Sequence, residues 1–324
     1  NSVIFFNQTR ELVMQLKRRD FLKGTAVAGT SFGLLPGLNA QTSSTGPLLT
    51  KPIPSTGEQL PIIGIGTNQY GGDTWDNGTE ETYEGLRETL KVYTDAGGTL
   101  IDTAPAYRGA EAVLGELFAE LGITDKLFIS NKVGSTSAAR ATEEMATSRA
   151  LLGVEQQDLV EIHSARNWRQ QLPALQEAKK EGTIRYLGVT TSIDRSHNEL
   201  IEIMNSEEID FVQVNYSIIG RNAEQRLLPL AIDKGIAVLA NVPFARGGTF
   251  AAVSGAELPE FAKEFGCQSW GNFFLKYIVS HPGVTAAIPG TSKPHHAADN
   301  LYAAMGRLPD AAERKMQEDF IASL

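Results

Sequence analysis

The sequence predicts an α/β fold, a (β/α)8 TIM barrel in which a parallel eight-stranded barrel is surrounded by outer helices. The chain has 324 residues, of which 42% are hydrophobic, enough to bury the core of one large domain. Apolar runs of strand length alternate with longer segments of helical period, a pattern typical of parallel sheets. There are eight such runs, the number that closes a barrel.

The predicted strands alternate with longer segments of helical period. We expect strands at 62–66, 99–102, 127–132, 159–163, 186–190, 211–215, 237–241 and 285–289. Helices are expected at 81–96, 111–121, 142–152, 170–180 and 224–234, several ending at a glycine that can form a C-cap. A doubly wound open sheet is the competing architecture, but the G-x-G-x-x-G turn that it needs for a dinucleotide is absent. The nearest match begins at Gly64 and fails at Gln69.

The N-terminal segment has the composition of an export signal. A basic stretch at 17–23 contains Arg18 and Arg19 and precedes an uncharged, Gly- and Ala-rich run that ends at Ala40. This layout predicts a twin-arginine signal peptide at 14–40, recognised by the twin-arginine export machinery. The apolar run is too short and too rich in glycine to favour a stable membrane anchor. A basic pair on a surface helix is the less favoured alternative.

The predicted domain organisation follows from this segment. Residues 1–13 are interpreted as an upstream extension or a fragment start, and 41–324 as the mature barrel domain, with a periplasmic or otherwise exported location. The whole chain carries a formal net charge of −9. An acidic body of this kind does not favour nucleic acid or an anionic membrane surface as a partner.

Cysteine and histidine usage argues against a metal site. Cys267 is the only cysteine, which excludes an intrachain disulfide and a cysteine-based zinc site. His295 and His296 have no metal-ligand spacing to His197 or His281. The sequence therefore predicts no bound metal.

Four residues that carry chemistry fall at the ends of three neighbouring predicted strands. Asp102 ends the second strand, Tyr107 lies in the loop behind it, Lys132 ends the third strand and His163 the fourth. In a (β/α)8 barrel these ends meet at the face that holds the active site. Each residue alone has an ordinary structural explanation, but four such explanations together are improbable.

This set of groups suits the reduction of a carbonyl. A phenol with a pKa of roughly 10 is too weak an acid to protonate a developing alkoxide unaided. We expect Lys132 to lower the pKa of Tyr107, Asp102 to compensate the buried ammonium, and His163 to donate to the carbonyl oxygen.

The segment from Gly98 to Glu111, with Asp102 and Tyr107 inside it, resembles the signature of the aldo/keto reductases. The resemblance runs over nearly the whole barrel, and Lys132 and His163 fall where that family places its lysine and histidine. It implies that Tyr107 is the general acid, tuned by Lys132 and Asp102, with His163 orienting the substrate. It also implies NADP(H) as the cofactor, with NAD(H) as an alternative.

The resemblance further implies a set of cofactor-binding residues. Gln213 would hold the nicotinamide carboxamide and Tyr216 would stack under the ring, while Thr190 and Thr191 replace the Ser-Asn pair common in the family. The loop and helix start that would bind the adenosine phosphate contain Gly290, Thr291, Ser292, Lys293, His296 and Asn300. Gly290 and His296 stand where many members carry Lys and Arg, so charge for a 2′-phosphate would rest on Lys293, with a protonated His296 assisting.

The substrate pocket is expected to have walls drawn from predicted loops, and the substrate is expected to be a small carbonyl compound: a sugar, an aldehyde or a ketone. The candidate wall residues are Asn68, Tyr70, Trp75, Trp168 and Phe244. Asn68 stands where several members of the family have tryptophan.

Two functions remain open on the sequence. The first is an NAD(P)H-dependent reductase acting through Tyr107. The second is an exported nicotinamide-binding sensor or accessory subunit without turnover, since a barrel fold alone does not fix function. Export supports the second, because NADPH is not regenerated outside the cytoplasm and the redox partner that would recycle it is unknown.

Overall fold

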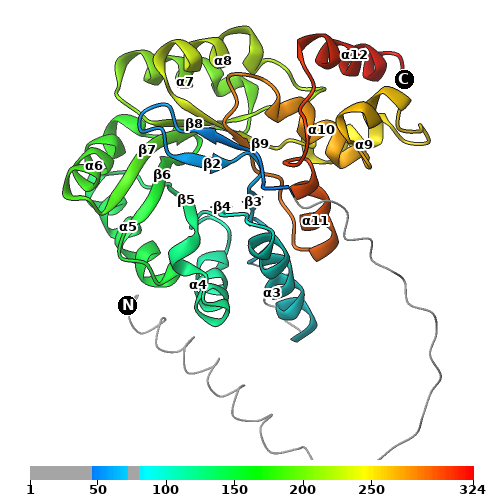
Figure 1. Ribbon diagram of the computed structural model, residues 1–324. Coiled ribbons are helices and arrows are strands. Elements are labelled where there is room, and N and C mark those ends of the chain that lie inside the picture. The colour runs from blue at the N-terminus through cyan, green and yellow to red at the C-terminus, as the bar shows by residue number, and fades with distance from the viewer. Residues whose placement is uncertain (1–45, 72–79) are drawn as a thin grey trace, which may run out of the picture. The chain divides into compact units, whose positions relative to one another are not determined.

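The computed structural model describes residues 46–71 and 80–324. The predicted upstream residues 1–13, the predicted signal peptide at 14–40 and Trp75 therefore lie outside the described residues. Within the described part, eight parallel strands form one sheet with helices around it (Figure 1). The strands are β3 Ile65–Gly66, β4 Leu100–Asp102, β5 Phe128–Val133, β6 Gln157–Ile162, β7 Ile184–Thr190, β8 Phe211–Asn215, β9 Ala237–Asn241 and β10 Ala286–Ala287.

The sheet closes on itself as a barrel. Strands β3 to β10 are neighbours in chain order, and parallel bridges join Ile63 to Ala287 and Gly66 to Gly290 across the remaining gap. The Gly64 amide donates to the Ala287 carbonyl at 2.8 Å, which adds to this closure. All eight predicted strands are confirmed, as is the barrel. β3 and β10 are shorter than the predicted strands 62–66 and 285–289, because only isolated bridges join these two strands where the barrel closes.

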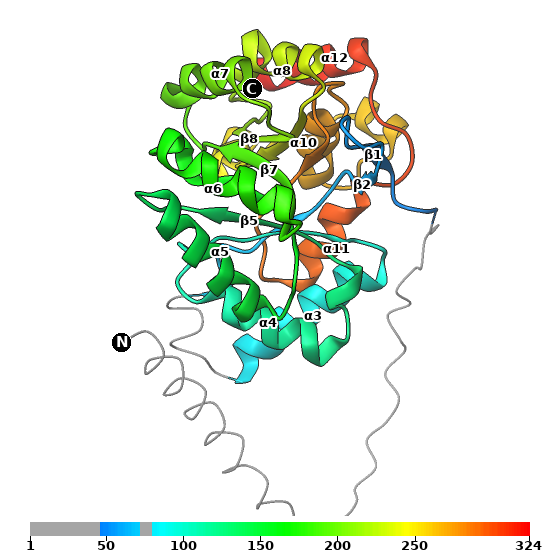
Figure 2. The ribbon, with the colours of Figure 1, turned by 90° about the vertical axis from the view of Figure 1, so that its left-hand side faces the viewer.

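The helices occupy the outside of the barrel, as Figure 2 shows for α4, α5, α6 and α7. All five predicted helices are present, although α5 begins four residues earlier than expected because the Ser137 side chain caps it by accepting from the Arg140 amide. None of the described helices is long and apolar enough to cross a membrane. The bounds are α3 Glu80–Asp95, α4 Ala110–Leu121, α5 Ala138–Leu152, α6 Trp168–Glu181, α7 His197–Ser206, α8 Ala223–Lys234, α9 Gly248–Ala252, α10 Trp270–Val279, α11 Pro294–Tyr302 and α12 Ala311–Ala322.

The barrel interior is apolar at one end and polar at the other. Side chains alternate along each strand, so every second residue points inward. At the amino-terminal ends of the strands, inward residues such as Phe128 and Phe211 form one apolar cluster with Ile53 and Leu60 of the β1–β2 hairpin (Thr50–Pro52 and Gln59–Pro61). The hairpin lies across the barrel in Figure 1. This end is therefore sealed, and the carboxyl ends of the strands are left for a site.

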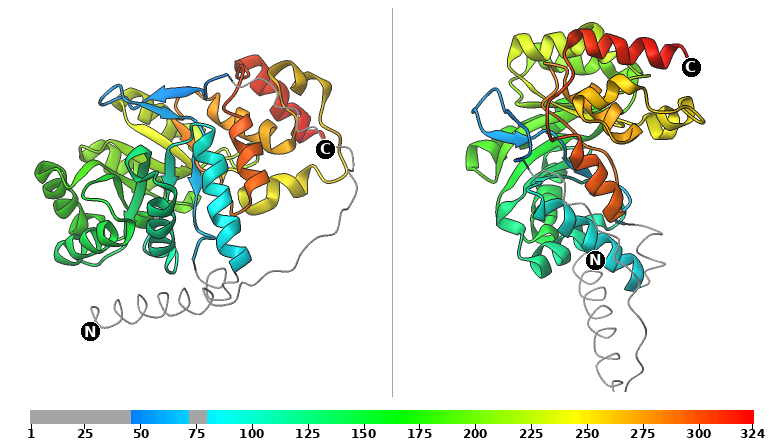
Figure 3. Two further views of the ribbon diagram at one scale, coloured as in Figure 1. Left: turned by 60° about the horizontal axis from the view of Figure 1, so that its bottom comes forward. Right: turned by 45° about the vertical axis from the view of Figure 1, so that its right-hand side comes forward.

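The late helices α10 and α11 are each held in place by a neighbouring helix. Helix α11 lies beside α3, as both views of Figure 3 show. Helix α12 is fixed to α10, because the Gln317 amide donates to the Phe273 carbonyl at 2.9 Å. The start of α11 and the start of α10 are thereby held near the loops that follow β9 and β10.

Candidate active site

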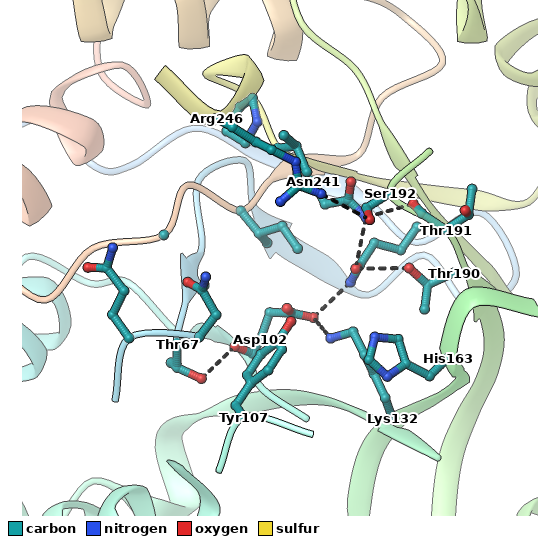
Figure 4. Close-up of a pocket in the computed structure, with 18 of the residues that line it drawn as sticks. Thr67, Asp102, Tyr107, Lys132, His163, Thr190, Thr191, Ser192, Asn241 and Arg246 are labelled. Carbon is teal, nitrogen blue, oxygen red and sulfur yellow. Dashed lines mark hydrogen bonds and ion pairs between the residues drawn. The ribbon is translucent and has the colours of Figure 1, made fainter. Parts of the chain in front are cut away.

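A cavity of about 450 Å3 opens at the carboxyl ends of the strands. Asp102, Tyr107, Lys132 and His163 all line it, and Figure 4 shows them turned toward one another. They come from β4, the loop after β4, β5 and the turn after β6. The strand ends thus bring together all four residues singled out in the sequence.

Lys132 and Asp102 form a buried ion pair. The Lys132 ammonium donates to Asp102 Oδ1 at 2.7 Å and to the Thr103 carbonyl at 2.8 Å. Both side chains are almost fully buried, with exposed fractions of 2% and 4%. Burial by itself would lower the pKa of Lys132, but the charge of Asp102 and the hydrogen bond to it raise that pKa, which stands above its ordinary value. Lys132 is therefore a fixed cation at neutral pH.

Tyr107 lies over this cation, with the Lys132 nitrogen 5.6 Å from the centre of its ring. The positive charge of Lys132 lowers the pKa of Tyr107, as the sequence predicted, but burial and the carboxylate of Asp102 raise it. The pKa of Tyr107 as a whole stands above its ordinary value, so the predicted effect of Lys132 is present but is outweighed. The phenol keeps its proton at neutral pH.

His163 presents an uncharged ring to the cavity. Burial, assisted by the charge of Lys132, lowers the pKa of His163 to about 4. Its backbone turn is unusual, because the next residue, Ser164, adopts a left-handed conformation with φ of 60°. A neutral imidazole in this place can donate one N–H to an oxygen in the cavity.

The side-chain amide of Gln213 makes its hydrogen bonds within the protein rather than presenting them to a ligand. Its amide nitrogen donates to Asp102 at 2.7 Å and to Glu161 at 2.9 Å. Its amide oxygen accepts from the Thr190 hydroxyl at 3.0 Å and from the Asn241 amide at 3.1 Å. Thr190, Thr191 and Gln213 all line the cavity as predicted, but Gln213 has no hydrogen-bonding capacity left for a carboxamide.

A second cavity of about 620 Å3 adjoins the first and shares Gln69, Phe244, Gly247 and Gly290 with it. It is open to the start of α11, where Lys293 stands at the N-cap and Pro294 begins the helix. Its lining includes the whole predicted phosphate-binding set Gly290, Thr291, Ser292, Lys293, His296 and Asn300. The two cavities share residues and so form one continuous site, and the second cavity carries Lys293 and Asp299 together with the aromatic side chains of Phe250 and Trp270.

His296 departs from the sequence prediction in its charge. Burial, together with the neighbouring His295 and Lys293, lowers the pKa of His296. The expected help from a protonated His296 is therefore wrong for the protein alone, and Lys293 is the cation of this segment.

Tyr216 lies away from both cavities, so its predicted stacking role is wrong. It is 1% exposed, and its hydroxyl bonds Glu224 and, at 2.8 Å, Arg314 on α12. The reason is the strand period: Gln213 faces the barrel interior, so Tyr216, an odd number of positions later, faces the helices. It packs there against Tyr277 of α10.

Two of the predicted pocket walls are core residues instead. Tyr70 is fully buried in the apolar cluster under α3 and α4, and Trp168 is buried at the start of α6 with Arg169 over its ring. Neither lines the cavities. Asn68 and Phe244 do line them. The sequence shows which residues of these loops are aromatic, but it does not determine the direction in which their side chains point.

The structure adds residues that sequence reasoning missed. Arg246 and Asn241 line the first cavity and Trp270 the second. Glu161 is fully buried, and it contacts Ser130 and Gln213 beside Asp102. A signal for Glu161 was present, since it is a charged residue inside a predicted strand, two positions before His163 and hence on the same face.

The model of the aldo/keto reductase family matches residues 62–318 of the chain. The protein belongs to this family. Membership makes it an oxidoreductase, and the matched segment covers the strands and all four clustered residues of the first cavity.

Curated relatives in this family are reductases. The chain is 30% identical over 227 residues to the NADH-specific methylglyoxal reductase of Escherichia coli, covering 60% of this chain and 67% of the relative. It is 29% identical over 218 residues to aldo-keto reductase YhdN of Bacillus subtilis, covering 60% of this chain and 62% of the relative, less than two thirds. It is 29% identical over 249 residues to methylglyoxal reductase YeaE of Escherichia coli, covering 74% and 84%.

Solved structures share the fold. The thermostable aldo-keto reductase Tm1743, solved with the inhibitor epalrestat, is 28% identical with a TM-score of 0.69, covering 84% of this chain and 99% of that one. An aldo/keto reductase from Klebsiella pneumoniae, solved with NADP and acetate, has a TM-score of 0.69 at 23% identity, covering 82% and 93%. The second likeness supports the barrel architecture alone.

Proposed function

We propose that this protein is an NAD(P)H-dependent reductase of small aldehydes and ketones, with Tyr107 as the general acid. The observation that carries the proposal is the meeting of Tyr107 and His163 over the buried Lys132–Asp102 pair in one cavity. Two relatives are named as methylglyoxal reductases, which supports a carbonyl as the substrate class.

The joined cavities fit a nicotinamide dinucleotide. Gly66 and Gly290 form a bare backbone wall, and an added Cβ on Gly66 would lie 3.2 Å from the Ile288 carbonyl. Lys293 and the amides at the start of α11 suit a phosphate, because a helix N-terminus favours anions. In the first cavity, next in sequence to the shared Gly247, Arg246 is exposed, with one long contact of 3.4 Å to Ser192, and it would bind the linking phosphates. When bound, the cofactor would supply the hydride.

The residues of this chain would supply the proton and the orientation. A carbonyl oxygen placed in the first cavity would accept from the Tyr107 hydroxyl and from the neutral His163 ring. As the carbonyl carbon is reduced, Tyr107 would pass its proton to the oxygen and leave a tyrosinate beside Lys132. The ammonium stabilises that tyrosinate, which is where the ion pair would act in the reaction.

The walls of the first cavity favour a small, polar substrate. Phe244, Val242 and Pro243 give one apolar side, while Asn68, Ser164 and Ser192 give polar groups. The two aromatic walls expected from Tyr70 and Trp168 are missing, so a large aromatic substrate would find little to stack on. We propose short-chain oxo-aldehydes and hydroxy-ketones as the substrates to test first.

We also propose that the chain is exported by the twin-arginine route, supported by the basic stretch at 17–23 and the apolar run behind it. This is tested by fusing residues 14–40 to a reporter protein that must fold and mature before it is exported. Export that survives Arg18→Lys with Arg19→Lys would contradict it.

The reductase proposal is tested with protein beginning at Gln41 and a panel of small carbonyls, following oxidation of NADPH and NADH by absorbance. We expect turnover in the wild type and a loss of about 10²–10⁴-fold in Tyr107→Phe. Cofactor binding without turnover of any carbonyl in the wild type would support the sensor hypothesis instead.

A further inference from the structure

The inner face of the barrel holds a second carboxyl group beside the Lys132–Asp102 pair. Glu161 lies directly across from Lys132 in the register of β5 and β6, and its side chain is 0% exposed. Its neighbour on the other side, Gly188 of β7, has no side chain. Two carboxyl groups therefore share one buried space with a single ammonium.

The hydrogen bonds distinguish the two carboxyl groups. Asp102 Oδ1 accepts from Lys132 at 2.7 Å, from Gln213 at 2.7 Å and from the Ser130 hydroxyl at 3.0 Å. Glu161 Oε2 accepts from Gln213 at 2.9 Å and from Ser130 only at 3.5 Å. Hydrogen bonds to a carboxylate favour its charged form, so Asp102 is the better site for the negative charge.

The other oxygen of Glu161 reinforces this difference. Oε1 is buried and finds no hydrogen-bond partner among the described residues, and no ion pair joins Glu161 to Lys132 in that part of the chain. A buried carboxylate oxygen without a donor is costly, whereas a protonated carboxyl group avoids most of that cost. With Lys132 already neutralised by Asp102, a second negative charge here would have no counter-ion.

We propose that Glu161 is a positioning residue of this site, holding a proton in the resting protein so that Lys132 faces a single buried carboxylate. The charge of Lys132 then acts on Tyr107 without being offset by a second carboxylate. When alkaline solution removes the proton from Glu161, the added negative charge disfavours the tyrosinate and makes Tyr107 a weaker acid. Besides Asp102 and Lys132, the titratable groups that face this cluster are Tyr107 and His163 at the cavity.

Burial agrees with this assignment, since it raises the pKa of Glu161 well above the ordinary value even though Lys132 opposes the rise. The catalytic consequence rests on the proposed reductase function, but the protonation of Glu161 does not. The two can therefore be tested separately.

The protonation state is tested by infrared spectroscopy of the full-length protein without substrate. At neutral pH the wild type should show the carbonyl stretch of a buried carboxylic acid that disappears in Glu161→Gln. The matched control is Glu111→Gln, which replaces another buried glutamate, bonded to Asn131 at 2.9 Å on the outer side of the barrel. Absence of a band that depends on Glu161 would overturn the proposal, whatever the activity.

The effect on Tyr107 is tested by its ultraviolet titration, with Tyr107→Phe as the blank. Glu161→Gln cannot take on the negative charge that Glu161 acquires in alkaline solution, so the proposal predicts that Tyr107 ionises at lower pH in this variant than in the wild type. In Glu161→Gln the rate of single-turnover hydride transfer should still decline at alkaline pH, but the decline should depend on one proton fewer than in the wild type. An unchanged titration of Tyr107 in Glu161→Gln would show that Glu161 does not act on Tyr107 and would overturn the proposal.

If Glu161→Gln does not fold, the carboxyl carbon shifts of labelled glutamate in the wild type decide the same question. One glutamate signal should titrate at a pH far above the others, and Glu111→Gln should leave that signal in place. Absence of such a signal would refute the proposal. Failure of the reductase proposal would appear separately, as a protein that shows the Glu161 signal but reduces no carbonyl.

Discussion

Replacing Lys132 with methionine should destabilise the protein strongly, because it leaves a buried charge without its partner. Asp102 is 2% exposed, and after the substitution only Ser130 and Gln213 would still donate to it. Breaking a buried ion pair in this way costs about 3–5 kcal/mol in the free energy of unfolding. For a domain of this size that corresponds to a fall in Tm of roughly 5–8 °C.

The assay is urea unfolding followed by tryptophan fluorescence at several pH values, with a double variant as the control. Lys132→Met combined with Asp102→Asn removes both charges and should recover most of the loss, leaving a cost of about 1–2 kcal/mol from imperfect hydrogen bonds. A loss below about 1 kcal/mol in the single variant, or no recovery in the double variant, would refute the buried ion pair as described.

Three further predictions concern other parts of the site. Because the pKa of His163 falls from 6.5 in the unfolded chain to about 4 in the fold, stability should decrease as pH falls through that range, by roughly 3 kcal/mol at about 1.4 per unit. His163→Asn should remove this contribution to the pH dependence of stability and abolish turnover. His281, whose pKa burial also lowers to about 4, is the control: His281→Asn should reduce the acid sensitivity of stability and keep turnover. Equal loss of turnover in both variants would contradict the proposed site. Lys293→Met should weaken binding of NADPH about tenfold and of NADH much less in a fluorescence titration, and an equal effect on both would show that Lys293 does not contact a 2′-phosphate. Tyr216→Phe should cost about 1 kcal/mol of stability through its lost bond to Arg314 and leave cofactor affinity unchanged; a tenfold weaker affinity would restore the stacking role.

The barrel could be predicted from the sequence because its strands are apolar runs of the right length in strict alternation with helices. The clustering of Asp102, Lys132 and His163 could also be predicted, since the carboxyl ends of parallel strands meet at one face. These inferences depend on period and order along the chain, which local sequence determines.

The direction of side chains in loops could not be predicted in the same way. Tyr70 and Trp168 lie in segments that were expected at the cavity, yet both pack into the core. The turn after β6 contains non-glycine residues with left-handed backbone, among them Ser164 and Asn167, and no sequence rule places such turns. Tyr216 was predictable in principle, because counting from the inward Gln213 puts it on the outer face.

The charge balance of the interior was the largest omission. The effect of Lys132 on Tyr107 was predicted in direction, but Glu161 was left out of the prediction. The pKa of Tyr107 depends on the charges of Lys132 and Asp102 and on burial, and the protonation of Glu161 decides whether a further negative charge is added. Pairwise reasoning from motif residues cannot recover a contribution from a neighbour outside the motif.

The central claim is that hydride reaches a carbonyl carbon in the first cavity while Tyr107 protonates the oxygen. The most direct measurement is a single turnover with NADPH deuterated at the transferred position, using protein that begins at Gln41 and a small oxo-aldehyde, with mass analysis of the alcohol product. We predict one deuterium on the former carbonyl carbon in the wild type and almost none formed in the same time by Tyr107→Phe. Unlabelled product, or equal labelling by both proteins, would contradict the account.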